Sequence, residues 1–225
     1  AGRASGRPRP PPGGCRMKPA AFAHLRPASL EAALAEAAGG PEAQGARFMG
    51  GGQSLGPMLN LRLVRAPRLV DLSALPELAA CHETETHVEI GAAVTHARIE
   101  DGACPEPAGG MLRKIAAGIA YRAVRNRGTI GGSLCHADPA ADWVSGLVAM
   151  GASVVLHGPG GARRELAVEQ FVLGAYRTAL APGEVLVKVR IPRRSGAVAW
   201  GYYKICRKVG EFAEAIGAFV ADPEA

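Results

Sequence analysis

Residues 128–142 read GTIGGSLCHADPAAD, and residues 49–55 read MGGGQSL. In each stretch adjacent glycines precede small polar side chains. Glycine loses more conformational freedom on folding than any other residue, so its repeated use needs a structural reason. In a glycine turn several backbone N–H groups can point into one concavity, which then binds an anion such as a pyrophosphate. The two stretches therefore predict two places where a ligand comes close to the main chain.

Neither stretch matches a standard nucleotide motif, because G-K-[ST] is absent and neither fits G-x-G-x-x-G in a βαβ unit. Taken alone, each is explained well enough as a tight turn for a hairpin or for close packing. The two together, each after an apolar stretch, favour a dinucleotide that lies between them. Gln53 and Ser54 can add side-chain donors in the first stretch, as can Thr129 and Ser133 in the second.

Helical patterns lie on both sides of the glycine stretches. Ser29 is a suitable N-cap for the first helix, and Gly39 and Gly40 would end it. Asp138 followed by Pro139 is a typical helix opening. We expect helices over the following segments: 29–38, 111–119 and 138–150.

Strands are predicted where apolar and polar residues alternate. The clearest case is GEVLVKVRIP, which would place these side chains on one face: Val185, Val187, Val189 and Ile191. A hairpin would turn at residues 158–161. Because strands dominate the second half of the chain, the fold class is α+β.

The composition limits the class of protein. Apolar residues make up 48% of the 225 residues, which indicates a globular protein. No apolar run approaches the roughly 18 residues of a membrane span, so we expect none. Of the 26 basic residues, four arginines fall in residues 1–16, and the remainder has 22 basic and 20 acidic residues. That body has no basic stripe, so we expect no nucleic-acid binding.

The N-terminus and the cysteines suggest a cytoplasmic protein. Residues 1–16 are rich in Gly, Pro and Arg and read as a disordered leader without a secretory signal, with the folded part beginning near Met17. The cysteines have no C-x-x-C pairing and are expected to be reduced thiols rather than cluster or zinc ligands: Cys15, Cys81, Cys104, Cys135 and Cys206. Three histidines near one strand are better explained as surface residues than as metal ligands: His82, His87 and His96.

The two glycine stretches and their flanks together resemble a known family, the FAD-binding medium subunits of the molybdenum hydroxylases (carbon monoxide dehydrogenase and xanthine dehydrogenase type). The similarity runs from Met17 nearly to the end, in the family's order. The matching stretches are MKPAAFAHLRPASLEAALAEA, GGGQSLGPMLNLRLVRAPRLVDLSALPEL, RNRGTIGGSLCHADPAAD, TALAPGEVLVKVRIP and YYKICRKVGEFA.

The resemblance implies a two-lobed FAD-binding domain, with FAD between the lobes. The first lobe would span residues 17–74 and the second 75–193. Residues 194–225 would begin a C-terminal domain that is truncated relative to the family. Without it, apolar surface would be left open around Phe212, Ile216 and Phe219.

The resemblance also implies the residues that bind the cofactor. Main-chain donors to the pyrophosphate would come from Gly51, Gly52, Gln53, Ser54 and Leu55, and the second motif would supply Thr129, Ile130, Gly131, Gly132 and Ser133. Asp142 would hold the flavin's sugar-like chain or its ring, Leu186 would pack on the ring, and Lys204 would lie near it. From the residues alone, Asp142 fits equally a solvated first-turn acid, Leu186 a core residue and Lys204 a surface residue. Arg125 and Arg127 fit a solvated basic turn or contacts to a partner.

The implied function is electron transfer within an oxidoreductase complex. The chain would pass electrons from a small iron–sulfur subunit through FAD to NAD or another acceptor, while a large molybdopterin subunit acts on the substrate. No G-x-S-x-G motif or other nucleophile–base set is present, so no residue is assigned a catalytic role, and no metal site is expected. Two alternatives stay open: a stand-alone flavin oxidoreductase of the same superfamily, and a truncated remnant without function.

Overall fold

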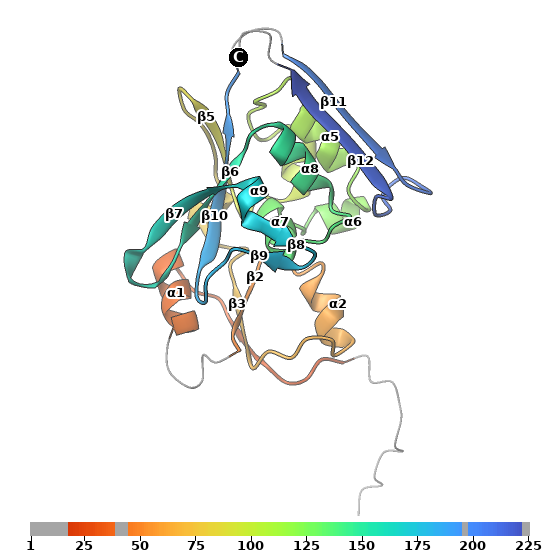
Figure 1. The fold of residues 1–225 in the computed structure, drawn as a ribbon. Coiled ribbons are helices and arrows are strands. Elements are labelled where there is room, and N and C mark those ends of the chain that lie inside the picture. The colour runs from red at the N-terminus through yellow and green to blue at the C-terminus, as the bar shows by residue number, and fades with distance from the viewer. Residues whose placement is uncertain (1–17, 39–44, 195–197, 222–225) are drawn as a thin grey trace, which may run out of the picture.

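A computed structural model of the chain describes residues 18–38, 45–194 and 198–221. The predicted leader over residues 1–16 lies outside these ranges, as do Gly39, Gly40 and Cys15. Helices and strands mix along the described chain (Figure 1). Among the described helices, none has both the length and the apolar character needed to cross a bilayer.

The N-terminal part forms a small parallel sheet with the strand order β1-β3-β2. Its elements are β1 (Ala23–Leu25), α1 (Leu30–Ala38), β2 (Arg47–Met49), α2 (Leu55–Asn60) and β3 (Arg68–Asp71). The Ser29 hydroxyl accepts a hydrogen bond from the Ala32 amide at 3.1 Å, so the predicted cap of α1 is confirmed. The first glycine stretch joins β2 to α2 and therefore lies at the carboxyl edge of this sheet, where ligands bind in many open sheets.

A larger antiparallel sheet has the order β4-β5-β10-β6-β7. The helix α3 (Pro76–Ala79) precedes it, and its strands are β4 (Cys81–Glu83), β5 (His87–Gly91), β6 (Ser153–His157), β7 (Arg163–Ala167) and β10 (Val185–Pro192). A short 3-10 turn over Pro159–Gly161 joins β6 to β7, which confirms the predicted hairpin.

The strand β10 departs from the strict alternation that its sequence predicts. Its register against β6 shifts between Leu186 and Lys188, which marks a bulge at Val187. Val185 and Val187 pack with the N-terminal sheet, whereas Leu186 and Val189 pack in the main core. The expected single apolar face is therefore wrong, because a bulge reverses the alternation of side chains along a strand. As a result β10 contributes to both cores.

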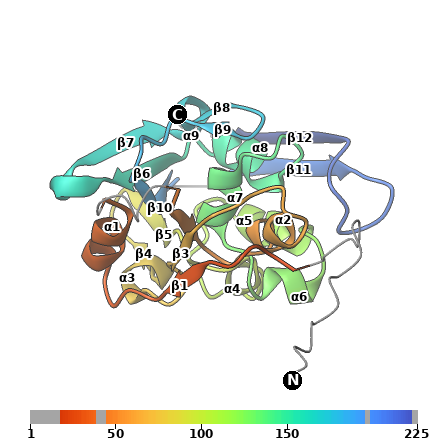
Figure 2. The same cartoon turned by 90° about the horizontal axis from the view of Figure 1, so that it is seen from below.

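Helices between β5 and β6 cover the main core. They are α4 (His96–Glu100), α5 (Met111–Ala117), α6 (Arg122–Arg125), α7 (Ile130–His136) and α8 (Asp142–Ala149), and α9 (Val168–Phe171) follows β7. In Figure 2, which views the molecule from below, α2 overlaps α5 of this layer, whereas α1 lies on the left, beside the strands of the larger sheet. Trp143, Met111 and Phe171 are fully buried in the core beneath these helices.

Two predicted helix boundaries are wrong. The helix α5 ends at Ala117, and Ile119 lies outside it, because Ala120 turns the chain with a left-handed φ of 42°. The helix α8 begins at Asp142 rather than at Asp138. Asp138 instead closes the turn before α8, since its Oδ1 accepts the Ala140 amide at 2.9 Å.

Two hairpins complete the described chain: β8 (Val172–Gly174) with β9 (Arg177–Thr178), and β11 (Ala199–Ile205) with β12 (Ala215–Ala221). The β11–β12 hairpin lies beside α5 and α8 (Figures 1 and 2). Phe212 and Phe219 are exposed, as expected. The expectation for Ile216 is wrong, because it pairs with Lys204 and is half-buried.

A disulfide joins Cys81 of β4 to Cys104, with Cα atoms 5.5 Å apart. The prediction of reduced thiols is therefore wrong for this pair, while Cys135 and Cys206 are free. Spacing along the sequence does not reveal that β4 and the loop after α4 lie side by side.

Candidate functional site

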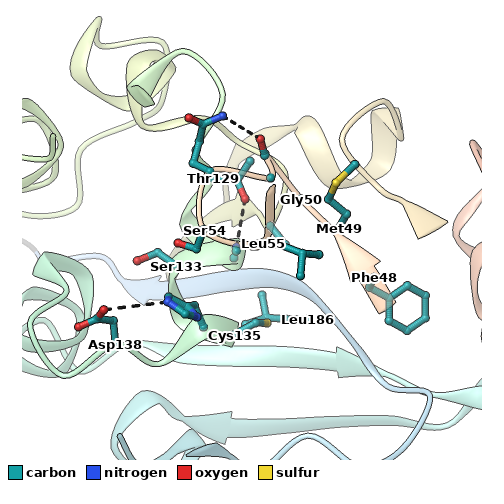
Figure 3. Close-up of a pocket in the computed structure, with 18 of the residues that line it drawn as sticks. Phe48, Met49, Gly50, Ser54, Leu55, Thr129, Ser133, Cys135, Asp138 and Leu186 are labelled. Carbon is teal, nitrogen blue, oxygen red and sulfur yellow. Dashed lines mark hydrogen bonds and ion pairs between the residues drawn. The ribbon is translucent and has the colours of Figure 1, made fainter. Parts of the chain in front are cut away.

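A cavity of about 670 Å³ lies between the N-terminal sheet and the helices of the main core. Its volume falls within the roughly 300–1,000 Å³ typical of small-molecule sites. Figure 3 shows Phe48 and Met49 on one side of it and Ser133 and Asp138 on the other. The predicted site residues that line it are Gly51, Gly52, Gln53, Ser54, Leu55, Thr129, Gly131, Gly132, Ser133, Asp142 and Leu186. Ile130 is instead fully buried in the main core.

The first glycine turn lines this cavity and contains unused backbone donors. Within the described residues, no acceptor is found for the amides of residues 51–55. Gly52 has a φ of +71°, a left-handed conformation that favours glycine. The Gln53 amide group donates to the Gly51 carbonyl at 3.2 Å and so is used within the turn itself. Successive free amides of this kind can bind an anion.

The second glycine stretch has a different structure from the one its sequence predicts. It begins the helix α7, with Thr129 as N-cap, and its amides already have acceptors. Ile130 donates to Val94 at 3.1 Å, Gly131 to Ala92 at 3.0 Å and Ser133 to Thr129 at 3.0 Å, all at the carbonyl oxygen. The Gly132 amide donates to Oγ1 of Thr129 at 3.1 Å. The prediction of a second open anion-binding turn is therefore wrong, because these donors are used in folding.

Glycine is needed in both stretches because they pack closely on neighbouring backbone. A Cβ on Gly51 would lie 1.7 Å from the carbonyl oxygen of Arg127 and 2.8 Å from the nitrogen of Gly128. A Cβ on Gly131 would lie 2.5 Å from Cβ of Ala92. The first turn therefore rests on the segment that leads into the second, and the two form one continuous wall.

Asp142 and Lys204 form a buried ion pair beside the cavity. Lys204 Nζ lies 2.9 Å from Asp142 Oδ1, and the side chains are 8% and 6% exposed. Lys204 also donates to the Gly118 carbonyl at 3.0 Å, and the Tyr202 hydroxyl donates to Asp142 at 2.7 Å. Burial, and then the bond to Asp142, raise the pKa of Tyr202. Lys204 is thus placed behind Asp142 and does not line the cavity, and neither residue is a solvated surface group.

His96 also lines the cavity, and the prediction of a surface residue is wrong for it. It is only 5% exposed, and its Nδ1 accepts a hydrogen bond from Nε1 of Trp143 at 3.1 Å. Burial, assisted by the charge of Arg125, lowers the pKa of His96 to about 4. The ring is therefore neutral at pH 7. The sequence does not show this burial, because the partner Trp143 lies 47 residues further along the chain.

This burial predicts acid sensitivity. Between pH 6.5 and about 4 the unfolded chain protonates this histidine and the folded chain does not, so stability falls as the pH falls. Between pH 7 and pH 5, the free energy of unfolding should therefore fall by about 2 kcal/mol more in the unmodified chain than in His96→Gln. Urea unfolding at both pH values measures this, with the exposed His82→Gln as control. Equal losses in His96→Gln and the unmodified chain would contradict the account.

A polar cluster at the cavity also went unpredicted. The Tyr176 hydroxyl donates to Asp138 at 3.3 Å, and His136 Nε2 lies 4.0 Å from the same carboxylate oxygen. Cys135 lines the cavity next to them. The sequence signal for this cluster is the C-H-A-D run directly after the second glycine stretch.

Arg125 has a structural role and is not part of a solvated basic turn. Its side chain is 12% exposed and pairs with Glu100 at 2.7 Å. It also donates to the carbonyls of Ile119 at 2.9 Å and Ala120 at 2.8 Å, both of which line the cavity. The bond from Arg125 also lowers the pKa of Glu100. Arg125 thereby fixes this part of the wall.

Comparison with known proteins identifies the family of the chain. A family described as "FAD binding domain in molybdopterin dehydrogenase" matches residues 20–194. The chain belongs to this family. It is therefore an FAD-binding subunit of the molybdenum hydroxylase type, and an oxidoreductase component with FAD as its cofactor.

Relatives of this FAD-binding subunit are named subunits of larger enzymes. Caffeine dehydrogenase subunit beta from Pseudomonas sp. (strain CBB1) is 33% identical over 208 residues, which cover 92% of this chain and 70% of the relative. The carbon monoxide dehydrogenase medium chain of Hydrogenophaga pseudoflava is 36% identical over 199 residues, covering 88% and 68%. The chain thus spans about 70% of their length.

Solved structures show the same mixed helix-and-sheet fold. Carbon monoxide dehydrogenase from Hydrogenophaga pseudoflava matches with a TM-score of 0.83 and 36% identity, over 90% of this chain and 69% of that one. Quinoline 2-oxidoreductase from Pseudomonas putida 86 matches with a TM-score of 0.81 and 37% identity, with the same coverage.

Proposed function

We propose that FAD lies in the 670 Å³ cavity with its pyrophosphate at the first glycine turn. The free amides of residues 51–55 carry this proposal, because they form an anion cradle without needing any side-chain charge. The close contact of Gly51 with Arg127 supports it, since a side chain there would fill the wall. The flavin ring would lie at the end formed by Asp142 and Leu186.

In this proposal FAD lies between two lobes, residues 17–74 and residues 75–193, and residues 194–225 begin a C-terminal domain. Each lobe supplies one glycine stretch to the shared wall. Hydrogen bonds of Thr129 and Gly131 fix the shape of the second stretch. Gly132 and Ser133 would therefore contact the ligand as part of the cavity wall and not through free amides.

Asp142 and Lys204 are assigned a positioning role. Lys204 neutralises the buried carboxylate and ties β11 to the Gly118 carbonyl, so it acts through Asp142 rather than on the ligand. Asp142 remains a hydrogen-bond acceptor at the cavity wall. FAD, when bound, supplies one- and two-electron redox chemistry that no side chain provides.

We propose that the chain is the electron-transfer subunit of a molybdenum hydroxylase complex. It would receive electrons from a small iron–sulfur subunit and deliver them to NAD or another acceptor, with a large molybdopterin subunit acting on the substrate. The multi-subunit enzymes named among its relatives support this reading. The test mixes the flavin-loaded chain with its reduced iron–sulfur partner: the visible flavin band should bleach, and should recover on adding the acceptor. A band that stays oxidised would contradict electron transfer.

The position of the cofactor is tested by filling the cavity. Ser133→Trp should abolish FAD binding while the chain stays folded, because Ser133 is a half-buried cavity residue. Val148→Trp, on the exposed side of α8, is the matched control and should bind FAD normally. FAD titration followed by flavin fluorescence measures both, and heat should release the flavin, since the binding is non-covalent. Normal FAD affinity in Ser133→Trp would place the cofactor elsewhere.

A further inference from the structure

His96 is a buried imidazole in the cavity wall that the glycine motifs do not account for. Trp143 Nε1 can only donate, so Nδ1 of His96 must accept and carries no proton. The neutral ring therefore has its proton on Nε2. Trp143 is fully buried, and its bond fixes the orientation of the imidazole.

The Nε2 atom is the ring nitrogen that remains available to a ligand. Among the described residues, Nε2 of His96 has no hydrogen-bond partner. Every fully enclosed side-chain nitrogen or oxygen in the described part of the chain does have a partner. Nε2 is therefore not enclosed, and His96 is one of the residues that line the cavity.

The imidazole and the first glycine turn meet at one residue. A Cβ on Gly128 would lie 2.9 Å from Nε2 of His96, and a Cβ on Gly51 would lie 2.8 Å from the nitrogen of Gly128. The His96 amide also donates to the Gly128 carbonyl at 2.9 Å. Gly128 thus contacts both the imidazole and the first glycine turn, and all three line the same cavity.

We propose that His96 binds FAD by donating a hydrogen bond from Nε2–H to a pyrophosphate oxygen. The inference rests on the proposed placement of FAD in this cavity. A neutral donor suits a buried site, because it adds a charge-assisted hydrogen bond without burying a cation. The lowered pKa of about 4 keeps the ring in this form across the physiological range.

The test compares two substitutions. His96→Leu removes the donor and should weaken FAD and ADP binding roughly ten- to a hundredfold, whereas riboflavin, which has no phosphate, should bind unchanged. His96→Gln can donate from its amide and should lose less. His82→Gln is the control for an exposed histidine. Unchanged FAD affinity in His96→Leu, or an equal loss for riboflavin, would overturn the proposal.

A measurement on the unmodified chain covers the case in which His96→Leu fails to fold. In ¹⁵N-histidine spectra at pH 7, His96 should be a neutral ring protonated at Nε2, and saturation with FAD should shift that signal. An unchanged Nε2 signal would overturn the proposal. If Ser133→Trp loses FAD while His96→Leu keeps it, only this inference fails; if Ser133→Trp also binds FAD normally, the placement of FAD fails with it.

Discussion

Gly51→Ala should lower the melting temperature of the chain by roughly 6–12 °C and abolish FAD binding. The added Cβ would lie 1.7 Å from the Arg127 carbonyl oxygen and 2.8 Å from the Gly128 nitrogen. Both are backbone atoms, so neither can rotate away as a side chain could. Overpacking of this kind costs about 3 kcal/mol, and each kcal/mol shifts the melting temperature of a chain this size by about 2–4 °C. If the two glycine stretches separate, the amides of residues 51–55 would also lose the arrangement that we propose binds the pyrophosphate.

Gly56→Ala provides the matched control. Gly56 lies in α2, a few residues along from Gly51, and a Cβ there would have no neighbour within 4 Å. Alanine favours a helix over glycine by roughly 0.5–1 kcal/mol, so this variant should be slightly more stable and bind FAD normally. Thermal melting and FAD titration compare the two variants. A Gly51→Ala chain that melts and binds FAD like Gly56→Ala would refute the contact between the two glycine stretches.

Lys204→Met should destabilise the chain by about 3–5 kcal/mol, because it leaves the carboxylate of Asp142 buried without its cation. Adding Asp142→Asn should restore much of this loss, since the remaining amide carries no charge and can still accept from Tyr202. Urea unfolding of both single variants and the double variant gives the coupling energy of the pair.

The exposed pair of Arg207 and Glu211 supplies the control for this prediction. Arg207 is 80% exposed, and exposed ion pairs contribute about 0–1 kcal/mol, so Arg207→Met should change little. If Lys204→Met costs no more than Arg207→Met, the pair is not buried in solution as described.

The sequence predicts the local features of this fold well. The cap at Ser29, the hairpin at residues 158–161 and the glycine turn at Gly52 all depend on neighbouring residues, and the structure contains each of them. The resemblance to the FAD-binding family also rests on such short stretches. These features are predictable because local backbone conformation follows from local residue type.

The sequence does not predict features that depend on a hydrogen-bonding or packing partner distant in the chain. The Gly131 amide donates to the carbonyl of Ala92, about forty residues earlier in the chain. The motif alone therefore cannot show that this amide already has an acceptor. The bulge at Val187 depends on pairing with β6, and the burial of His96 depends on Trp143. The contact between residue 131 and Ala92 is likewise hidden in the sequence, although a side chain at residue 131 would meet Ala92 and disturb the fold.

Hydrogen–deuterium exchange with and without FAD tests most directly whether the first glycine turn holds the cofactor. The amides of residues 51–55 have no acceptor among the described residues and should exchange at nearly the unprotected rate in the FAD-free chain. Saturation with FAD should slow them by about tenfold or more, whereas the amides of residues 130–133, already bonded, should be slow in both states. If the amides of residues 51–55 exchange at the same rate when FAD is bound, the first turn is not the pyrophosphate site and the central claim is wrong.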